Sequence, residues 1–144
     1  MMQRHSVAGL ICFVLALSAC GAVAAEQQKL FNGKDLNGWE GNPSLWSVED
    51  GAITGRTKAD DPIKHNTFLI WRDGKVGDFK LTFKYKIEGG NSGVQYRSEV
   101  KDPKEWVVGG YQADIDSSPV YTGILYEELG RGILAKRGQS VTIG

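Results

Sequence analysis

The chain has 144 residues, with 17 lysines and arginines against 17 aspartates and glutamates. Without a leader that contains Arg4, 16 basic residues would face 17 acidic ones, which excludes the strongly basic surface of a nucleic-acid-binding protein. Beyond residue 25, no stretch is long and apolar enough to predict a membrane-spanning helix.

The first 25 residues are typical of a leader for export. An apolar stretch over residues 7–19 is too short to cross a membrane alone. Residues 17–20 resemble a lipobox that would lipidate Cys20, whereas ordinary cleavage just before Glu26 fits as well. The sequence therefore predicts a secretory or lipoprotein signal peptide and a place in the periplasm or cell envelope of a bacterium. The protein would be lipid-anchored through Cys20 in one case and secreted in the other.

The rest of the chain, residues 26–144, is long enough for one domain. The two cysteines, Cys12 and Cys20, both lie in the leader. The domain therefore has no disulfide and no thiolate ligand or nucleophile, and its packed core must hold it together.

Short β-branched and aromatic runs separated by turn dipeptides predict an all-β fold. Residues 46–49 and 52–55 flank Asp50-Gly51 and predict a hairpin, because this dipeptide supplies the positive φ angles of a tight turn. Residues 67–71 form a continuous apolar run, which predicts a strand buried on both faces.

Strict alternation of apolar and polar residues over residues 79–88 predicts a long strand with one buried face. Further strands are expected at residues 94–100 and 111–116, separated by a loop over residues 101–108. Short strand segments follow, and the last one, residues 141–144, ends with the chain. The sequence thus predicts a sandwich that is incomplete at its C-terminus.

Two of these expected strands carry polar residues at alternate positions. The residues are Gln95, Arg97, Glu99, Gln112, Asp114 and Asp116. If the strands pair, these side chains converge on one sheet face with the amides, guanidinium and carboxylates that bind sugar hydroxyls. A solvated lattice of weak cross-strand ion pairs remains an alternative.

Two further candidates lie in expected loops. His65 is the one histidine of the domain and is either an ordinary surface residue or a general base or metal ligand. Glu127 follows Tyr126 in a charged segment that could form a catalytic rim or a plain turn. The sequence requires no cofactor, although a divalent cation such as calcium is compatible with it.

Several motifs resemble the 3-keto-disaccharide hydrolase domain family, formerly a domain of unknown function. They are Leu30-Phe31-Asn32-Gly33-Lys34-Asp35-Leu36-Asn37-Gly38-Trp39, Trp46-Ser47-Val48-Glu49-Asp50-Gly51, Gly89-Gly90-Asn91-Ser92-Gly93-Val94-Gln95-Tyr96-Arg97, Gly110-Tyr111-Gln112-Ala113-Asp114-Ile115 and Thr122-Gly123-Ile124-Leu125-Tyr126. The resemblance implies a concanavalin A-like or jelly-roll β-sandwich of two antiparallel sheets. It also implies an exported hydrolase that cleaves 3-keto-glycosides or 3-keto-disaccharides.

In that chemistry the C3 ketone acidifies the C2 proton, so cleavage can proceed by proton abstraction, elimination and hydration. By residue type and placement, Asp114 or Glu127 suits the base, with His65 in reserve, and Arg97 suits polarisation of the ketone. Residues expected to bind the sugar are Asn91, Gln95, Gln112 and Tyr126. The alternatives are a non-catalytic carbohydrate-binding module at the cell envelope and a structural domain without chemistry.

Overall fold

The structure, a computed structural model, describes residues 27–140 and residue 142. The expected leader, with Cys12 and Cys20, and most of the last expected strand lie outside the described residues. The described part contains strands and no helix, and accordingly no helix within it could cross a membrane.

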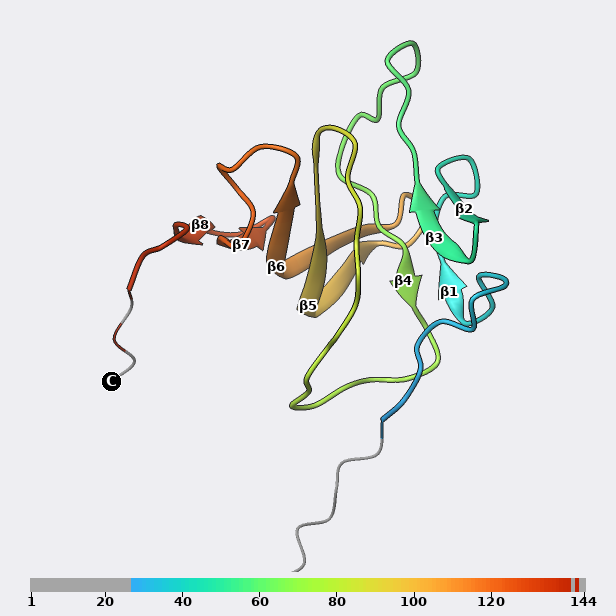
Figure 1. Cartoon of the computed structure of the whole chain (residues 1–144), viewed down its shortest axis with the longest axis horizontal. Coiled ribbons are helices and arrows are strands. Elements are labelled where there is room, and N and C mark those ends of the chain that lie inside the picture. The colour runs from blue at the N-terminus through green and yellow to red at the C-terminus, as the bar shows by residue number, and fades with distance from the viewer. Residues whose placement is uncertain (1–26, 141, 143–144) are drawn as a thin grey trace, which may run out of the picture.

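Eight strands form three antiparallel sheets (Figure 1). The strands are β1 (Trp39–Glu40), β2 (Trp46–Glu49), β3 (Ala52–Gly55), β4 (Ile70–Trp71), β5 (Asn91–Asp102), β6 (Val107–Asp116), β7 (Leu125–Glu128) and β8 (Gly132–Ala135). β1 pairs with β4, β2 pairs with β3, and the other four form a sheet in the order β5-β6-β7-β8. The predicted all-β, antiparallel fold is confirmed.

The small hairpin β2–β3 forms where the sequence predicts it. Asp50 and Gly51 both have positive φ angles, 50° and 74°, as the turn between two closely paired strands requires. The register sets Val48 opposite Ile53 and Glu49 opposite Ala52. Local turn chemistry is therefore sufficient to define this element.

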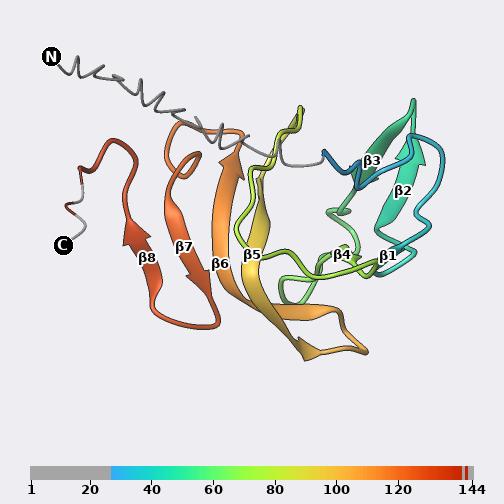
Figure 2. The ribbon, with the colours of Figure 1, turned by 90° about the horizontal axis from the view of Figure 1, so that it is seen from below.

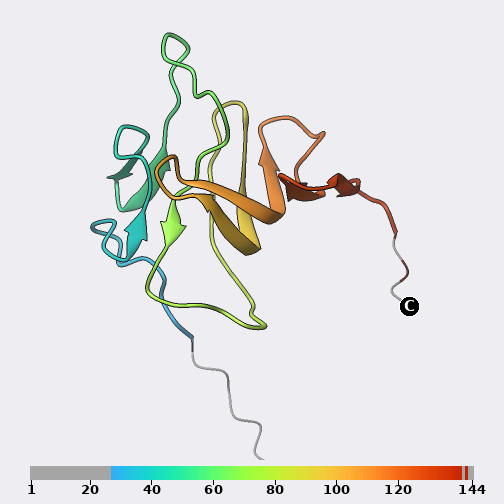
Figure 3. The same cartoon turned by 180° about the vertical axis from the view of Figure 1, so that it is seen from behind.

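The four-stranded sheet is the largest element of the structure and carries the polar residues of interest. β5 to β8 lie side by side in chain order, and the two small sheets lie beyond β5, on the side away from β8 (Figures 2 and 3). β5 extends to Asp102 and β6 begins at Val107. The loop expected at residues 101–108 is therefore reduced to a short turn over residues 103–106.

The strand expected at residues 79–88 is absent, which corrects the prediction from alternation. The segment runs without ladder pairing, and its apolar side chains Phe79, Leu81, Phe83 and Tyr85 are 40% to 55% exposed. Phe79 makes an edge-to-face contact with Tyr96, with ring centroids 6.5 Å apart. Alternation shows that a segment can form a strand, but a strand also needs a partner for its backbone and a layer over its apolar face.

The buried strand expected at residues 67–71 is also shorter than predicted. Only Ile70–Trp71 forms a strand, and both residues are half-buried. Within the described residues, the buried apolar side chains are Val108 and Ile124, whereas the buried polar ones are Gln112, Asp114 and Glu128. The most enclosed part of the sheet is thus a polar one.

Candidate functional site

One face of the four-stranded sheet gathers six polar side chains, which we call the polar face: Asn91, Gln95, Gln112, Asp114, Tyr126 and Glu128. Strand register places them together, because Gln95 is opposite Gln112, Gln112 is opposite Tyr126, and Glu128 is opposite Gly110. Residues two apart on a strand point to the same side, so the neighbours at 91, 114 and 128 share this face. Of the residues expected to converge on one sheet face, the structure brings Gln95, Gln112 and Asp114 together. Asn91 and Tyr126, expected to bind the sugar, lie on the same face.

A directed chain of hydrogen bonds crosses the polar face and ends on Asp114. The Ser98 hydroxyl donates to Gln95 Oε1 at 2.9 Å, and Gln95 Nε2 donates to Gln112 Oε1 at 3.1 Å. Gln112 Nε2 then donates to Asp114 Oδ1 at 2.8 Å, and Asn91 Nδ2 donates to Asp114 Oδ2 at 3.3 Å. Two neutral amide donors thus hold the Asp114 carboxylate in a fixed orientation on this face, which suits a general base.

Tyr126 lies between the two buried carboxylates of this face. Burial raises the pKa of the Tyr126 phenol above its ordinary value, and the negative charges of Glu128 and Asp114 raise it further. The phenol therefore stays protonated at neutral pH. In this position Tyr126 can donate a hydrogen bond or a proton, but it cannot serve as a base.

Arg97 does not lie on the polar face, contrary to expectation. β5 contains a bulge between Tyr96 and Glu99, where Arg97 has a positive φ of 47°. Ser98 takes the space above Gly110, where a Cβ would lie 2.5 Å from the Ser98 hydroxyl oxygen. The extra residue breaks the alternation and sends the Arg97 guanidinium to Asp78, with an Nη2–Oδ1 distance of 2.7 Å.

The family is identified by comparison with known proteins. The family model described as a 3-keto-alpha-glucoside-1,2-lyase-like domain matches residues 26–143. The chain belongs to this family. The chain is also 35% identical over 86 residues to a protein of Bacteroides thetaiotaomicron named 3-keto-disaccharide hydrolase. The match covers 53% of the chain and 29% of that relative, so the chain spans less than a third of the relative's length. No solved structure matches the chain.

Within this family member, Glu127 lies on the opposite side of the sheet from Asp114. Glu127 is opposite Tyr111, whereas Tyr126 and Gln112 face the other way. The carboxylate of Glu127 pairs with Arg131, whose hydrogen bonds from side chain and backbone hold the pKa of Glu127 below its usual range. Glu127 is therefore a stabilised anion, which makes it a weaker base than an ordinary glutamate.

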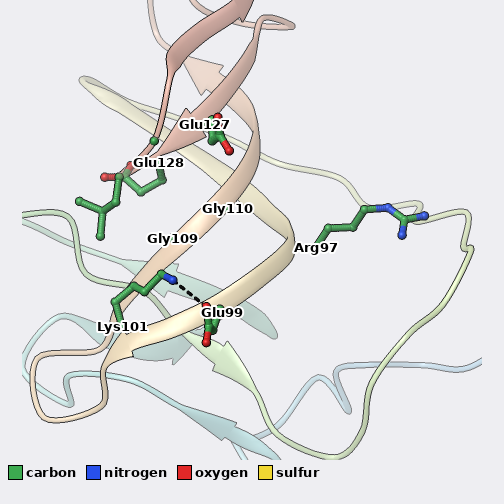
Figure 4. A pocket seen from close by; sticks show the side chains of 9 residues that line it. Arg97, Glu99, Lys101, Gly109, Gly110, Glu127 and Glu128 are labelled. Carbon is green, nitrogen blue, oxygen red and sulfur yellow. Dashed lines mark hydrogen bonds and ion pairs between the residues drawn. The ribbon is translucent and has the colours of Figure 1, made fainter.

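An open pocket lies beside Glu127, where β5 bulges against β6. Its lining consists of Arg97, Glu99, Lys101, Gly109, Gly110, Glu127, Glu128, Leu129 and Gly130. Figure 4 shows Arg97 pointing away from Glu128 and Lys101, while Lys101 and Glu99 form an ion pair at 2.6 Å. Arg97 and Lys101 already pair with carboxylates of the protein, so this pocket has fewer free hydrogen-bonding groups for a sugar than the polar face has.

His65 lies in an exposed loop before β4. Its Nε2 atom is 3.7 Å from a carboxylate oxygen of Glu105, and its neighbour Asn66 reaches the polar face. Among residues 27–140 and 142, no group of three or more His, Cys, Asp or Glu side chains is placed to hold a metal ion. The predicted alternatives for His65 as a base or ligand stay predictions.

Sequence reasoning missed Glu128 and Asn66. Glu128 is only 7% exposed, and its Oε2 accepts a hydrogen bond of 2.9 Å from Asn66 Nδ2. A period-two signal was available: Glu128 is two residues after Tyr126, so it shares the face of Tyr126, and Glu127 does not. Asn66 lies 62 residues away in sequence, and no local pattern could have linked it to Glu128.

Proposed function

We propose that the protein cleaves 3-keto-glycosides, such as 3-keto-disaccharides, on the polar face of the four-stranded sheet. The observation that carries this proposal is the buried Asp114 carboxylate, 8% exposed and oriented by two amide donors beside the protonated Tyr126 phenol. A base and an acid on one enclosed surface are what elimination next to a ketone needs. Membership of the family and the name of the Bacteroides relative support the choice of substrate class.

The reaction begins with the C2 proton, which the neighbouring C3 ketone makes acidic. Asp114 takes this proton, and the C–H electron pair moves into an enolate with its charge on the C3 oxygen. Collapse of the enolate breaks the bond between C1 and the glycosidic oxygen. That oxygen takes the proton held by Asp114 and leaves as the free alcohol, so Asp114 is a carboxylate again. Water then adds across the C1–C2 double bond of the enone, so the sum of the steps is hydrolysis.

Because its phenol is protonated, Tyr126 acts as a hydrogen-bond donor in this reaction. A phenol donor at the C3 oxygen stabilises the enolate, and removing such a donor from an active site typically costs about 100-fold to 1000-fold in rate. Arg97 was expected to polarise the ketone, but the bulge directs it to Asp78, so this role passes to Tyr126. Gln95 and Gln112 bind and orient sugar hydroxyls while they hold Asp114 in place.

A non-catalytic sugar-binding module is the second candidate, because a face of amides and carboxylates suits hydroxyl groups whether or not a reaction follows. A measurement of turnover distinguishes the enzyme from the binding module. The purified protein is incubated with 3-keto-sucrose in D₂O, and products are followed by chromatography and mass spectrometry. The elimination route places deuterium at C2 of the released 3-keto-glucose, beyond the exchange measured for authentic product in the same buffer.

The variant Asp114→Asn completes the test. We expect it to bind 3-keto-sucrose with an affinity similar to that of the wild type and to lose turnover by about 100-fold or more. Release of product without deuterium at C2 would contradict proton abstraction. Binding of the sugar by the folded wild-type protein without product would favour the module.

A further inference from the structure

Glu128 is a buried carboxylate on the polar face that the steps above do not use. It is 7% exposed, and within the described residues it takes part in no ion pair. One of its oxygens, Oε2, accepts a hydrogen bond of 2.9 Å from Asn66 Nδ2. Because a carboxylate has two oxygens and accepts several hydrogen bonds, this single neutral donor leaves most of its capacity unused.

The second oxygen of this carboxylate, Oε1, is open to solvent. Within residues 27–140 and 142, the hydrogen-bond donor to Glu128 is Asn66, which reaches Oε2. Oε1 is not among the enclosed side-chain atoms without a partner, which in the same part of the chain are the indole nitrogens of Trp46 and Trp106. Glu128 also borders the open pocket beside Glu127 (Figure 4). A carboxylate that is fixed at one oxygen and open at the other can bind a hydroxyl group of a ligand.

Glu128 lies at one end of the polar face, away from the Asp114 carboxylate. It is opposite Gly110 on β6, and Asp114 is four residues further along the same strand. At the rise of a β-strand, four residues span about 13 Å. Tyr126 and Gln112 are opposite each other and lie between these two points. A sugar over Asp114 and Tyr126 therefore leaves the Glu128 end of the face for a second ring joined to it.

The opposite end of the polar face suits a second ring less well, because its polar groups already bind one another. Asn91 donates to Asp114 at 3.3 Å, and the Asp116 carboxylate accepts a hydrogen bond of 2.8 Å from the Ser118 amide. An open acceptor on a buried carboxylate is thus a feature of the Glu128 end.

We propose that the Glu128 end of the polar face is a second sugar subsite, in which Glu128, fixed by Asn66, accepts hydrogen bonds from hydroxyl groups of the leaving sugar. The inference rests on the proposed function, because it places the reacting sugar over Asp114. A hydroxyl group binds a carboxylate more strongly than it binds a neutral acceptor, and a site built for such a bond discriminates against a ligand that lacks the hydroxyl. The subsite therefore selects 3-keto-disaccharides over 3-keto-glycosides whose leaving group has no further hydroxyl.

The loop that carries Asn66 is attached to the large sheet by two further hydrogen bonds. Thr67 Oγ1 donates to the carbonyl oxygen of Glu105 at 2.9 Å, and the Phe68 amide donates to that of Trp106 at 3.0 Å. Because these bonds do not involve Asn66, replacing it releases the Glu128 side chain without detaching the loop. Asn66→Ala thus separates the orientation of the carboxylate from its charge.

The experiment compares two substrates that share the reacting sugar, 3-keto-sucrose and methyl 3-keto-α-glucoside, whose leaving group is methanol. In the variant Glu128→Gln, the amide oxygen satisfies Asn66 and the NH₂ group faces the sugar, so an acceptor becomes a donor. We expect this variant to lower the ratio of kcat/KM for 3-keto-sucrose to kcat/KM for the methyl glycoside by about tenfold relative to wild type. Comparing ratios cancels the difference in reactivity between the two leaving groups.

Matched variants separate the subsite from general effects on the fold. Asn66→Ala should lower the same ratio less than Glu128→Gln does, because the charge remains. Glu127→Gln, the same change on the other side of the sheet, should leave the ratio unaltered. If Glu128→Gln does not fold, Glu128→Asp replaces it, and the ratio should fall because the shorter side chain withdraws the acceptor.

The outcomes distinguish this inference from the proposed function. An unchanged ratio in Glu128→Gln, with equal losses on both substrates, overturns the inference although the enzyme is active. If the folded wild type cleaves neither substrate, the proposed function is contradicted, and NMR titration of the ¹⁵N-labelled protein tests the subsite. There 3-keto-sucrose should shift the backbone amide signals of Asn66 and Glu128, and the methyl glycoside should not. Equal shifts with both sugars, or none with either, overturn the inference.

Discussion

The polar face and the segment over residues 78–88 were expected from the same kind of pattern, and they differ in outcome. Polar residues at alternate positions of β5, β6 and β7 meet in register and form a buried network. Apolar residues alternate just as strictly at 79–87, yet their side chains are about half exposed. The first pattern is fixed by ladder pairing on both sides of β6, and the second lacks such pairing in the described structure.

This difference shows that the placement of the buried polar side chains depends on strand register more than on burial of apolar side chains. Gln112 lies on β6 between Gln95 of β5 and Tyr126 of β7, where its backbone cannot shift without breaking two ladders, and Asp114 follows on the same strand opposite Gly93 of β5. Side chains of the 78–88 segment have no such constraint and can be changed with little effect on the sheet. Four sets of variants test how far the contrast between the two regions extends.

Two carboxylate variants, one on each side of the sheet, should give the largest difference in turnover. Asp114→Asn is expected to reduce turnover of a 3-keto-disaccharide by about 100-fold or more, because it removes the base. Glu127→Gln, on the opposite side of the sheet, should stay within about threefold of wild type, since exposed ion pairs contribute little. Steady-state rates at neutral pH measure both. A reversed order of the two effects would move the site to the pocket beside Glu127.

Glycine substitutions test whether close packing at the network matters. A Cβ at Gly93 would lie 2.6 Å from the Gln112 side chain, whereas one at Gly89 meets nothing within 4 Å. Gly93→Ala should lower the free energy of unfolding by about 1–3 kcal/mol and displace Gln112 from Asp114. Urea denaturation measures the change, with Gly89→Ala as the control. Equal stability of the two variants would argue that the network is loosely packed.

Variants of the exposed apolar side chains at residues 79–85 should change association between chains more than they change folding. Phe83 is 49% exposed, so Phe83→Lys is expected to alter the free energy of unfolding by less than about 0.5 kcal/mol. Exposed apolar side chains on an unpaired segment favour association between chains, and a lysine should reduce it. Analytical ultracentrifugation over a range of concentrations compares the variant with Lys84→Met, which adds an apolar group instead. A large loss of stability in Phe83→Lys would mean that these side chains are packed.

The smallest effect is expected at the Glu127–Arg131 ion pair. Arg131→Ala removes the side-chain hydrogen bond that is the largest cause of the lowered Glu127 pKa, but it keeps the backbone amide of residue 131 as a donor, so that pKa should rise part of the way toward its ordinary value. Because the folded-state pKa is depressed, the ion pair stabilises the protein above the pKa of an unfolded glutamate, and that contribution is lost as pH falls through the depressed value. NMR titration of the Glu127 carboxyl carbon follows the change. An unchanged pKa would show that Arg131 does not hold Glu127 in solution.

Much of the fold could be predicted from local chemistry. Asp50-Gly51 defines β2–β3, and alternation along β6 places Gln112 and Asp114 on one face. The meeting of Gln95, Gln112 and Asp114 could be predicted for the same reason, since period-two patterns survive wherever strands pair without interruption. The family resemblance followed from the same motifs and is confirmed by the family model.

The failures have a common physical cause in contacts between residues far apart in sequence. The bulge that turns Arg97 away depends on Ser98 fitting over Gly110 of the next strand. The Asn66–Glu128 hydrogen bond joins a loop to a strand 62 residues later. The unpaired segment at 78–88 differs from a strand by its surroundings and not by its composition. None of these features is encoded in the spacing of nearby residues.

The central claim is that the sugar binds on the polar face. It is tested most directly by titrating the ¹⁵N-labelled protein with 3-keto-sucrose and following backbone amide signals by NMR. We expect the largest shifts at Gln95, Gln112, Asp114 and Tyr126, with small changes at Lys101 and Glu127. Shifts confined to the pocket beside Glu127, or no shifts at millimolar sugar, would contradict it.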